Sequence, residues 1–99
     1  MGIIRATPSD LQAVLSLLVE CSLPDQDVTS NNMRTFLLLK EGEHLVGSVG
    51  LEIYRQDALL RSLAVKQEQR GRGLGKELLK ACESLAEESR AGLVKVVRR

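Results

Sequence analysis

The chain has 99 residues, 43% of them hydrophobic and 27% charged, which predicts one folded domain over residues 1–99 and excludes a disordered chain. A net charge of +1 with one Tyr, one Phe and no Trp argues against a nucleic-acid partner, since charge attraction and base stacking are both weak. No membrane-spanning run or leader pattern occurs, and two distant Cys with a single His indicate neither disulfides nor a zinc site, so we expect a cytoplasmic protein without a metal.

The first third of the chain predicts a strand followed by two helical segments. Residues 3–6 are predicted as a short strand. Thr7, Pro8 and Asp10 then form a helix start, because Thr7 can cap, Pro8 suits the first helical position and Asp10 can reach back to the cap. The apolar residues that follow have the spacing of one buried helix face: Leu11, Val14, Leu15 and Leu18. Residues 25–32 predict a second short helix or helical turn.

The middle of the chain predicts an antiparallel meander of three strands. Residues 35–39 are a continuous apolar run too short for a helix, which predicts a strand covered on both faces. Residues 44–54 and 58–65 predict the second and third strands. Gly47 and Gly50 lie inside the second strand and indicate close approach of another backbone or a bulge.

The last part of the chain predicts a long amphipathic helix and a final strand. The helix is expected from Gly73 to about Ser89, ending before Gly92, and its apolar face consists of Leu74, Leu78, Cys82 and Leu85. Residues 93–97 predict the strand. The resulting order, β-α-α-β-β-β-α-β without an internal repeat, predicts a single domain of the α/β (α+β) class.

The junction before this helix carries the most informative motif, Arg70-Gly71-Arg72-Gly73-Leu74-Gly75-Lys76. Helix N-termini present unpaired backbone N–H groups, and glycines let the backbone wrap a phosphate without a Cβ in the way. Between Arg61 and Lys76, five cationic residues face one acidic residue, Glu68. A local site for an anion with more than one phosphate is therefore predicted.

Three phosphate motifs compete for this segment. The P-loop, G-x-x-x-x-G-K-S/T, fails because Glu77 follows Lys76 and Arg70 stands where the first Gly belongs. The dinucleotide pattern, G-x-G-x-x-G, fails because Lys76 occupies the last glycine position. The third pattern, Q/R-x-x-G-x-G/A, fits Arg70, Gly73 and Gly75 without adjustment.

On these residues the sequence resembles the GNAT N-acetyltransferase family. The third pattern is similar to the loop with which that family holds the pyrophosphate of coenzyme A, and the order of predicted elements agrees over residues 3–97. The segment Arg61-Ser62-Leu63-Ala64-Val65 before the loop, and Leu78-Leu79 after it, strengthen the resemblance. Within the family, residues 21–27 and 50–65 look like the arsenic-resistance-associated subgroup.

The resemblance implies acetyl-CoA as cosubstrate and a GNAT-like mixed, mainly antiparallel sheet flanked by helices. The backbone of Leu63, Ala64 and Val65 is implied to pair with the pantetheine arm like an added strand. The pyrophosphate is implied to bind backbone amides of the turn formed by Arg70, Gly71, Arg72, Gly73, Leu74, Gly75 and Lys76. Glu52 is the candidate base for the acceptor ammonium, and Arg61 is a candidate contact that orients an acidic substrate.

Each of these assignments has a plainer alternative. A glycine-rich turn before a helix can be loop geometry alone, and an RGRG run can belong to an RNA-binding tail, although this one lies between a strand and an amphipathic helix. A single strand Glu such as Glu52 is commonly solvent-facing or ion-paired, and Arg61 can be structural. Cys21 and Cys82 are interpreted as small core residues.

The family's domain normally continues past the final strand with another helix and a hairpin that line the acceptor pocket. This sequence ends at Arg98-Arg99, so we expect a C-terminally shortened domain that forms a homo-oligomer, a dimer, through the open edge of its C-terminal strand. The predicted function is transfer of acetyl to a primary amine of a small, amino-acid-like acceptor. The alternative is a non-catalytic CoA-binding or regulatory fragment completed by self-association or a partner.

Overall fold

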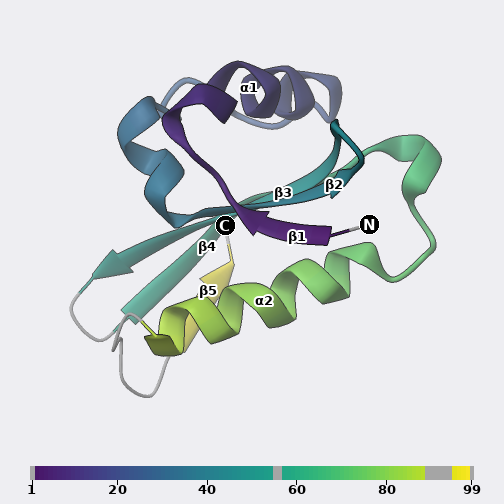
Figure 1. The fold of residues 1–99 in the computed structure, drawn as a ribbon. Helices are drawn as coiled ribbons and strands as arrows, with labels where there is room; N and C mark the ends of the chain where they lie inside the picture. The colour runs from purple at the N-terminus through teal and green to yellow at the C-terminus, as the bar shows by residue number, and fades with distance from the viewer. Residues whose placement is uncertain (1, 55–56, 89–94, 99) are drawn as a thin grey trace.

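The computed structural model describes residues 2–54, 57–88 and 95–98. The strands are β1 (Gly2–Arg5), β2 (Phe36–Glu41), β3 (His44–Tyr54), β4 (Asp57–Val65) and β5 (Lys95–Arg98). The helices are α1 (Leu11–Glu20) and α2 (Leu74–Glu88), with short 3-10 helices η1 (Pro8–Asp10), η2 (Ser30–Thr35) and η3 (Gln67–Gln69). The described strands form one five-stranded sheet in chain order, with α1 on one face and α2 on the other (Figure 1). The predicted fold class and order of elements are confirmed.

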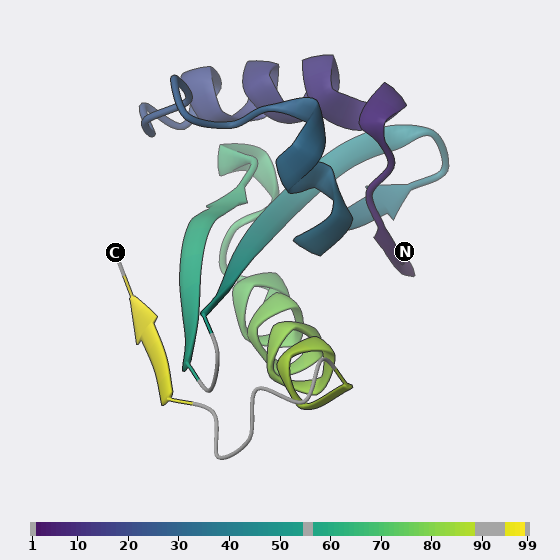
Figure 2. The ribbon, with the colours of Figure 1, turned by 90° about the vertical axis from the view of Figure 1, so that its left-hand side faces the viewer.

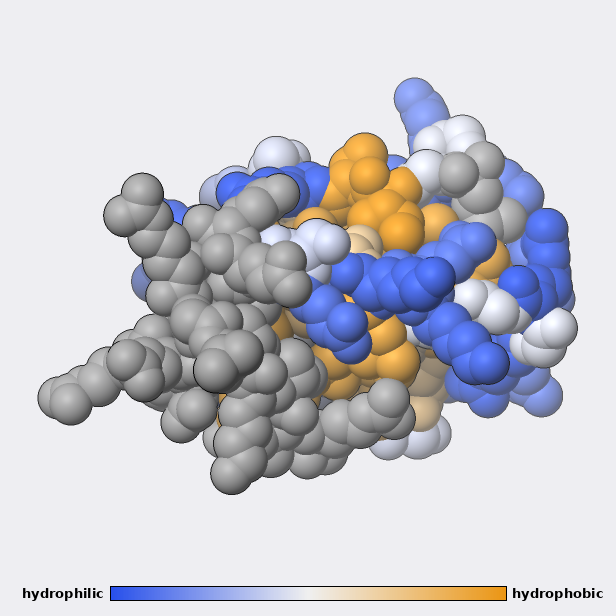
Figure 3. Space-filling model, turned by 90° about the horizontal axis from the view of Figure 1, so that it is seen from below, coloured by the Kyte–Doolittle hydropathy of each residue, from blue (hydrophilic) through white to orange (hydrophobic). Residues whose placement is uncertain are grey.

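Two hydrophobic cores lie on opposite faces of the sheet. In β2, Phe36 and Leu38 pack in the core under α1, whereas Leu37 and Leu39 pack in the core against α2. Successive side chains of a strand point to opposite faces, so this apolar run is buried on both sides, as predicted. Figure 3 views the molecule from the α2 side and shows a band of hydrophilic side chains crossing hydrophobic surface.

The predicted cap, Thr7, begins the 3-10 helix η1, which leads directly into α1. The Asp10 carboxylate accepts a hydrogen bond from the Thr7 backbone N–H at 2.8 Å. This bond is the main cause that lowers the pKa of Asp10 below its ordinary value; the contact with Lys40 lowers the pKa further, whereas burial opposes both effects. The helix places five residues in the core, with Val14, Leu17 and Leu18 fully buried and Leu11 and Leu15 partly buried. The predicted apolar face of α1 is confirmed, and Leu17 is an additional buried residue on that face.

The second helical segment differs from the prediction of residues 25–32. The structure has the 3-10 helix η2 at Ser30–Thr35 instead. The backbone N–H of Thr29 donates to the side-chain oxygen of Asn32 at 2.6 Å, so the capping residue is Thr29. Met33 is completely buried under α1, which is what holds this turn against the sheet.

The three middle strands form the predicted antiparallel meander, and both of its glycines are needed for packing. A Cβ added at Gly47 would lie 3.0 Å from the carbonyl oxygen of Ala64, so another backbone does approach closely there. A Cβ added at Gly50 would lie 2.6 Å from the Phe36 ring. Neither position has room for a larger residue without movement of its neighbour.

A bulge interrupts the pairing of β3 with β4. The register changes between two pairs, Ser48 with Ala64 and Gly50 with Arg61. Val49 of β3 therefore faces both Ser62 and Leu63 of β4, and Ser62 adopts a left-handed backbone with φ of +55°. The bulge that the glycines of β3 predicted is present, but its extra residue lies on β4.

The extra residue reverses the alternation of side chains along β4. Leu60, before the bulge, packs in the core against α2. Ala64, four residues later, packs in the core under α1, although an unbroken strand would place both on the same face. Leu63 and Val65 pack against the α2 core instead.

The last helix and strand follow the prediction closely. The predicted apolar face of α2 is buried: Leu74, Leu78, Cys82 and Leu85. Burial, and to a smaller extent Glu83, raises the pKa of the Cys82 thiol to about 11. The predicted strand over residues 93–97 is observed as β5 at 95–98, while Gly92 lies outside the described residues.

β5 pairs with β4 in parallel and covers only its first half. The paired residues of β4 run from Asp57 to Leu60, and Figure 2 shows β5 beside that part of the strand alone. Within the described residues, no strand pairs with this edge of β4 beyond Leu60. The edge from Arg61 to Val65 therefore offers backbone groups to an extended partner.

Candidate functional site

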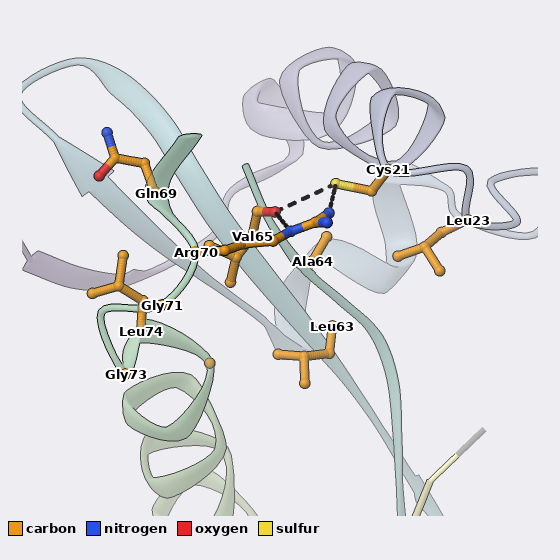
Figure 4. Close-up of a pocket in the computed structure, with 11 residues that line it drawn as sticks. Cys21, Leu23, Leu63, Ala64, Val65, Gln69, Arg70, Gly71, Gly73 and Leu74 are labelled. Atoms are coloured by element: carbon orange, nitrogen blue, oxygen red, sulfur yellow. Dashed lines mark hydrogen bonds between the residues drawn. The ribbon is translucent and has the colours of Figure 1, made fainter. Parts of the chain in front are cut away.

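A pocket of about 360 Å³ opens between this edge of β4 and the loop before α2 (Figure 4). Its lining comes from β4, from the loop and from the segment after α1: Leu63, Ala64, Val65, Gln69, Arg70, Gly71, Gly73, Leu74, Gly75, Cys21 and Leu23. The two predicted cofactor segments thus line a single pocket. Arg72 and Lys76, predicted with them, are exposed and do not belong to the lining.

The glycine turn leaves open space in front of the first turn of α2. Gly71 and Gly73 have φ of +85° and +75°, a backbone conformation that glycine adopts without strain. A Cβ added at Gly71, Gly73 or Gly75 would meet no other atom within 4 Å. The first backbone N–H groups of a helix lack intrahelical partners and carry partial positive charge. An anion can approach these groups here without displacing protein atoms.

Arg70 folds across the pocket toward the backbone of β4. Its Nε donates to the Val65 carbonyl oxygen at 3.0 Å, and its Nη2 lies 3.7 Å from the Cys21 sulfur. Cys21 also donates weakly to the same carbonyl, at 3.7 Å. Figure 4 shows these three groups meeting at one side of the pocket. Arg70 thus brings a positive charge to the boundary between the strand edge and the glycine turn.

Cys21 packs against the core under α1, in agreement with its interpretation as a core residue, and it also lines the pocket. Cys21 is only partly buried and lines the pocket, whereas Cys82 is buried as expected. Cys21 follows the last residue of α1, where the helix ends and the chain turns at Ser22, which has φ of +58°. At this turn Cys21 lies at the margin of the core and reaches the pocket.

The bulge beside the pocket is held by a buried hydrogen bond. Ser48 is completely buried, and its hydroxyl donates to the carbonyl oxygen of Ser62 at 3.2 Å. This contact fixes the backbone of β4 immediately before Leu63, where the pocket begins. Nothing in the local sequence predicts it, because the two serines meet only through the strand register.

Glu52 and Arg61, predicted on neighbouring strands, form an ion pair. Arg61 Nη1 donates to Glu52 Oε1 at 2.6 Å, and Nη2 donates to the Asp27 carboxylate. The hydrogen bond to Asp27 and then that to Glu52 raise the pKa of Arg61, against the opposing effect of burial. The Arg61 side chain is 8% exposed, compared with 17% for Glu52 and 56% for Asp27.

A second pocket, of about 240 Å³, adjoins this ion-pair network. It is lined by Leu23, Pro24, Asp27, Arg61 and Ser62. Leu23 is shared with the first pocket, so the two follow one another along β4 across the bulge. Sequence reasoning did not single out Asp27, since 34 residues separate it from Arg61 and no local pattern marks it.

The arrangement can hold an extended, anionic ligand next to a buried pair of charges. The strand edge supplies backbone hydrogen-bonding groups, the turn before α2 supplies N–H groups for an anion, and Glu52 supplies a carboxylate. Among the described residues, no cluster of three or more His, Cys, Asp or Glu side chains could hold a metal ion. Within the same part of the chain, no helix combines the length and the apolar character needed to cross a membrane.

Comparison with known proteins matches this architecture to one family. A model of the acetyltransferase (GNAT) family matches residues 9–98. A protein of Bacillus subtilis (strain 168), whose name assigns it a ribosomal protein bS18-alanine N-acetyltransferase activity, is 31% identical over 65 residues, which are 66% of this chain and 43% of the relative.

Two solved structures show the same fold. Rv2747 from Mycobacterium tuberculosis, in complex with CoA, superposes with a TM-score of 0.81 at 18% identity, over 97% of this chain and 63% of that one. N-acetylglutamate synthase from Neisseria gonorrhoeae, complexed with coenzyme A and N-acetyl-glutamate, gives 0.80 at 20% identity, over 96% and 24%. The chain thus spans less than two thirds of the length of these relatives. Since the family model covers nearly all of its sequence, the chain belongs to the acetyltransferase (GNAT) family.

Proposed function

We propose that the pocket between β4 and α2 binds acetyl-CoA, and that the protein transfers the acetyl group to a primary amine of a small, amino-acid-like acceptor. One observation carries this proposal: a strand edge with which no other described strand pairs, and a glycine turn at a helix start, line the same pocket. Acetyl-CoA has the matching shape, an extended arm with amide groups that ends in a diphosphate. The complexes of family relatives with CoA support the same ligand.

Within this proposal, each predicted cofactor residue has a separate task. The backbone of Leu63, Ala64 and Val65 pairs with the amides of the pantetheine arm. The N–H groups of residues 70–76 receive the diphosphate, and the charges of Arg70, Arg72 and Lys76 add to the attraction. The open space in front of the three glycines fits this role, because phosphate oxygens can reach the backbone there.

The reaction we propose needs a base and a polarising group. When bound, acetyl-CoA supplies a thioester carbonyl open to attack. Glu52 takes a proton from the acceptor ammonium, directly or through water, so that the nitrogen can attack. A backbone N–H of β4 stabilises the negative charge that develops on the carbonyl oxygen. The new bond joins the amine nitrogen to the acetyl carbon, the carbon–sulfur bond breaks, and the sulfur leaves as a thiolate. The nitrogen then loses a second proton to give the neutral amide, and a proton passed through water converts the thiolate into the CoA thiol.

Further expectations from the sequence belong to the same proposal. They are a single domain over residues 1–99, a cytoplasmic location, and membership of the arsenic-resistance-associated subgroup through residues 21–27 and 50–65. The predicted contact of Arg61 with an acidic group of the substrate also stays a prediction. The ion pairs of Arg61 with Glu52 and Asp27 favour a role in positioning these two carboxylates.

The binding proposal is tested by replacing Gly73 in the turn. Gly73→Asp places a carboxylate where the diphosphate is proposed to bind, and Gly73→Asn places a neutral side chain of the same shape there. We expect calorimetry to show that Gly73→Asp binds acetyl-CoA at least about tenfold more weakly than Gly73→Asn. The Asp carboxylate and the diphosphate carry like charges, which repel each other. Equal dissociation constants in the two variants would remove the basis for a diphosphate at this turn.

The enzyme is distinguished from a non-catalytic CoA-binding fragment by turnover. Thiol release from acetyl-CoA is measured with a panel of primary amines, and Glu52→Gln is expected to lower it about 100-fold or more, the usual contribution of a general base. Tight binding of acetyl-CoA with no turnover for any amine would favour the fragment, completed by self-association or a partner.

A further inference from the structure

The second pocket and the ion pairs beside it suggest how the acceptor side of the site is organised. The inference rests on the proposed acetyl transfer. An acceptor must meet the thioester at the far end of the pantetheine arm, beyond the strand edge at Leu63. The pocket lined by Asp27, Arg61 and Ser62 lies next to Leu63 along β4, on the side away from the glycine turn.

The alternation of side chains places Glu52 and Arg61 on the same face of the sheet. Leu51 and Leu60 pack in the core against α2, so their successors Glu52 and Arg61 point to the opposite face, the one covered by α1. The segment that follows α1 crosses this face and brings Asp27 to the Arg61 guanidinium. Arg61 therefore joins two neighbouring strands to the wall of the second pocket.

The donors of Arg61 are directed at protein groups. Nη1 and Nη2 donate to the carboxylates of Glu52 and Asp27, and Nε donates to the Ser62 hydroxyl at 3.3 Å. A guanidinium held in a rigid fork fixes the carboxylates it contacts. Its side chain is also 8% exposed, which leaves little surface for a substrate carboxylate.

We propose that Arg61 is a positioning residue that fixes the Glu52 carboxylate for proton transfer and anchors, through Asp27, the wall of the acceptor pocket. Glu52 does not itself line the second pocket, and its contact with Arg61 at 2.6 Å connects its carboxylate to a residue that does. The acceptor enters between the Asp27 wall and the bulge at Ser62. Arg61 acts through these two carboxylates and does not touch the acceptor.

The test compares kinetic constants of variants, using an amine that the wild type acetylates. Arg61→Gln is expected to lower kcat at least about tenfold, to raise the acceptor KM, and to leave the acetyl-CoA dissociation constant within about twofold. Arg61→Lys keeps one positive charge and should recover part of kcat. Arg34→Gln, at an exposed arginine of η2, is the matched control and should behave as wild type.

The two partners of Arg61 are expected to separate its effects. Glu52→Gln should lower kcat, whereas Asp27→Asn should raise the acceptor KM at least about threefold with little change in kcat. Asp27 is more than half exposed, so Asp27→Asn is expected to fold. It therefore tests the role of Asp27 in the acceptor pocket even if Arg61→Gln does not fold. An unchanged acceptor KM in Asp27→Asn would overturn the proposed anchor.

The double variant decides between positioning and direct contact. If Arg61 acts through Glu52, then adding Arg61→Gln to Glu52→Gln should change kcat by less than about twofold. A full additional loss would mean that Arg61 contacts the substrate, and normal kcat in Arg61→Gln alone would also overturn the inference. Absence of turnover in the wild type, by contrast, would reject the proposed acetyl transfer itself, and this inference with it.

Discussion

Cys21 and Cys82 have the same side chain, and their environments give them different chemistry. Cys82 is 1% exposed within the core against α2, and burial raises the pKa of its thiol to about 11. Cys21 lines the proposed cofactor pocket beside the Arg70 guanidinium. The thiolate is the reactive form, so exposure and pKa together decide which cysteine reacts.

We expect a thiol reagent at pH 8 to modify Cys21 and to leave Cys82 unmodified in the folded protein. The thiolate of Cys82 is about 100-fold less populated than that of a thiol with the ordinary pKa, and access to it is blocked as well. Acetyl-CoA should protect Cys21, because the proposed ligand would cover this side of the pocket. Mass spectrometry after timed labelling measures both rates, with Cys21→Ser as the control. Faster labelling of Cys82, or labelling of Cys21 unaffected by saturating acetyl-CoA, would contradict this assignment.

The bulge in β4 determines which side chains of this strand face each layer. It turns Ala64 toward α1 and leaves Leu63 and Val65 packed toward α2, beside the pocket. Ser48 holds the bulge by donating to the Ser62 carbonyl. Removing a buried donor leaves its acceptor without a partner, which costs free energy of unfolding.

Ser48→Ala should therefore lower the free energy of unfolding by about 1–3 kcal/mol. It should also weaken acetyl-CoA binding, since the backbone before Leu63 loses its hydrogen bond. Urea denaturation and calorimetry measure the two effects. Ser16→Ala, at an exposed position of α1, serves as the control and should change stability by less than about 0.5 kcal/mol. Identical denaturation midpoints for both variants would show that the Ser48 hydrogen bond does not stabilise the bulge.

The sheet formed by the described strands has β1 at one edge and β5 at the other. An edge strand presents unpaired backbone groups to which another chain can add. We therefore expect self-association through this C-terminal strand, as the sequence predicts for a dimer. The oligomeric state would then depend on protein concentration.

Light scattering over a concentration series tests this expectation. The measured mass should rise above that of the 10.9 kDa chain as concentration increases, and a dimer should give twice that value. Acetyl-CoA is included in a parallel series, because the proposed site is formed within one chain and binding should not require association. A mass that stays at the monomer value at high concentration would contradict the prediction.

Local patterns in the sequence were sufficient for most of the helices and strands and for the glycine turn before α2. The cap at Thr7, the helical spacing of Leu74, Leu78, Cys82 and Leu85, and the apolar run at residues 35–39 each predict a structure that is observed. Each of these patterns involves residues only a few positions apart. The chain itself therefore keeps the interacting groups close together. The glycine turn is readable for the same reason, since its positive φ values are set by the residues themselves.

Tertiary structure decided the contacts between distant segments. Arg61 meets Asp27 across 34 residues, and Cys21 meets Val65 across 44. Arg61 lies before the bulge at Ser62 and Val65 lies after it, and the bulge shifts the register of β4 by one residue between them. A shift of one residue moves every later side chain of the strand to the other face, so no local pattern could predict which groups line the site.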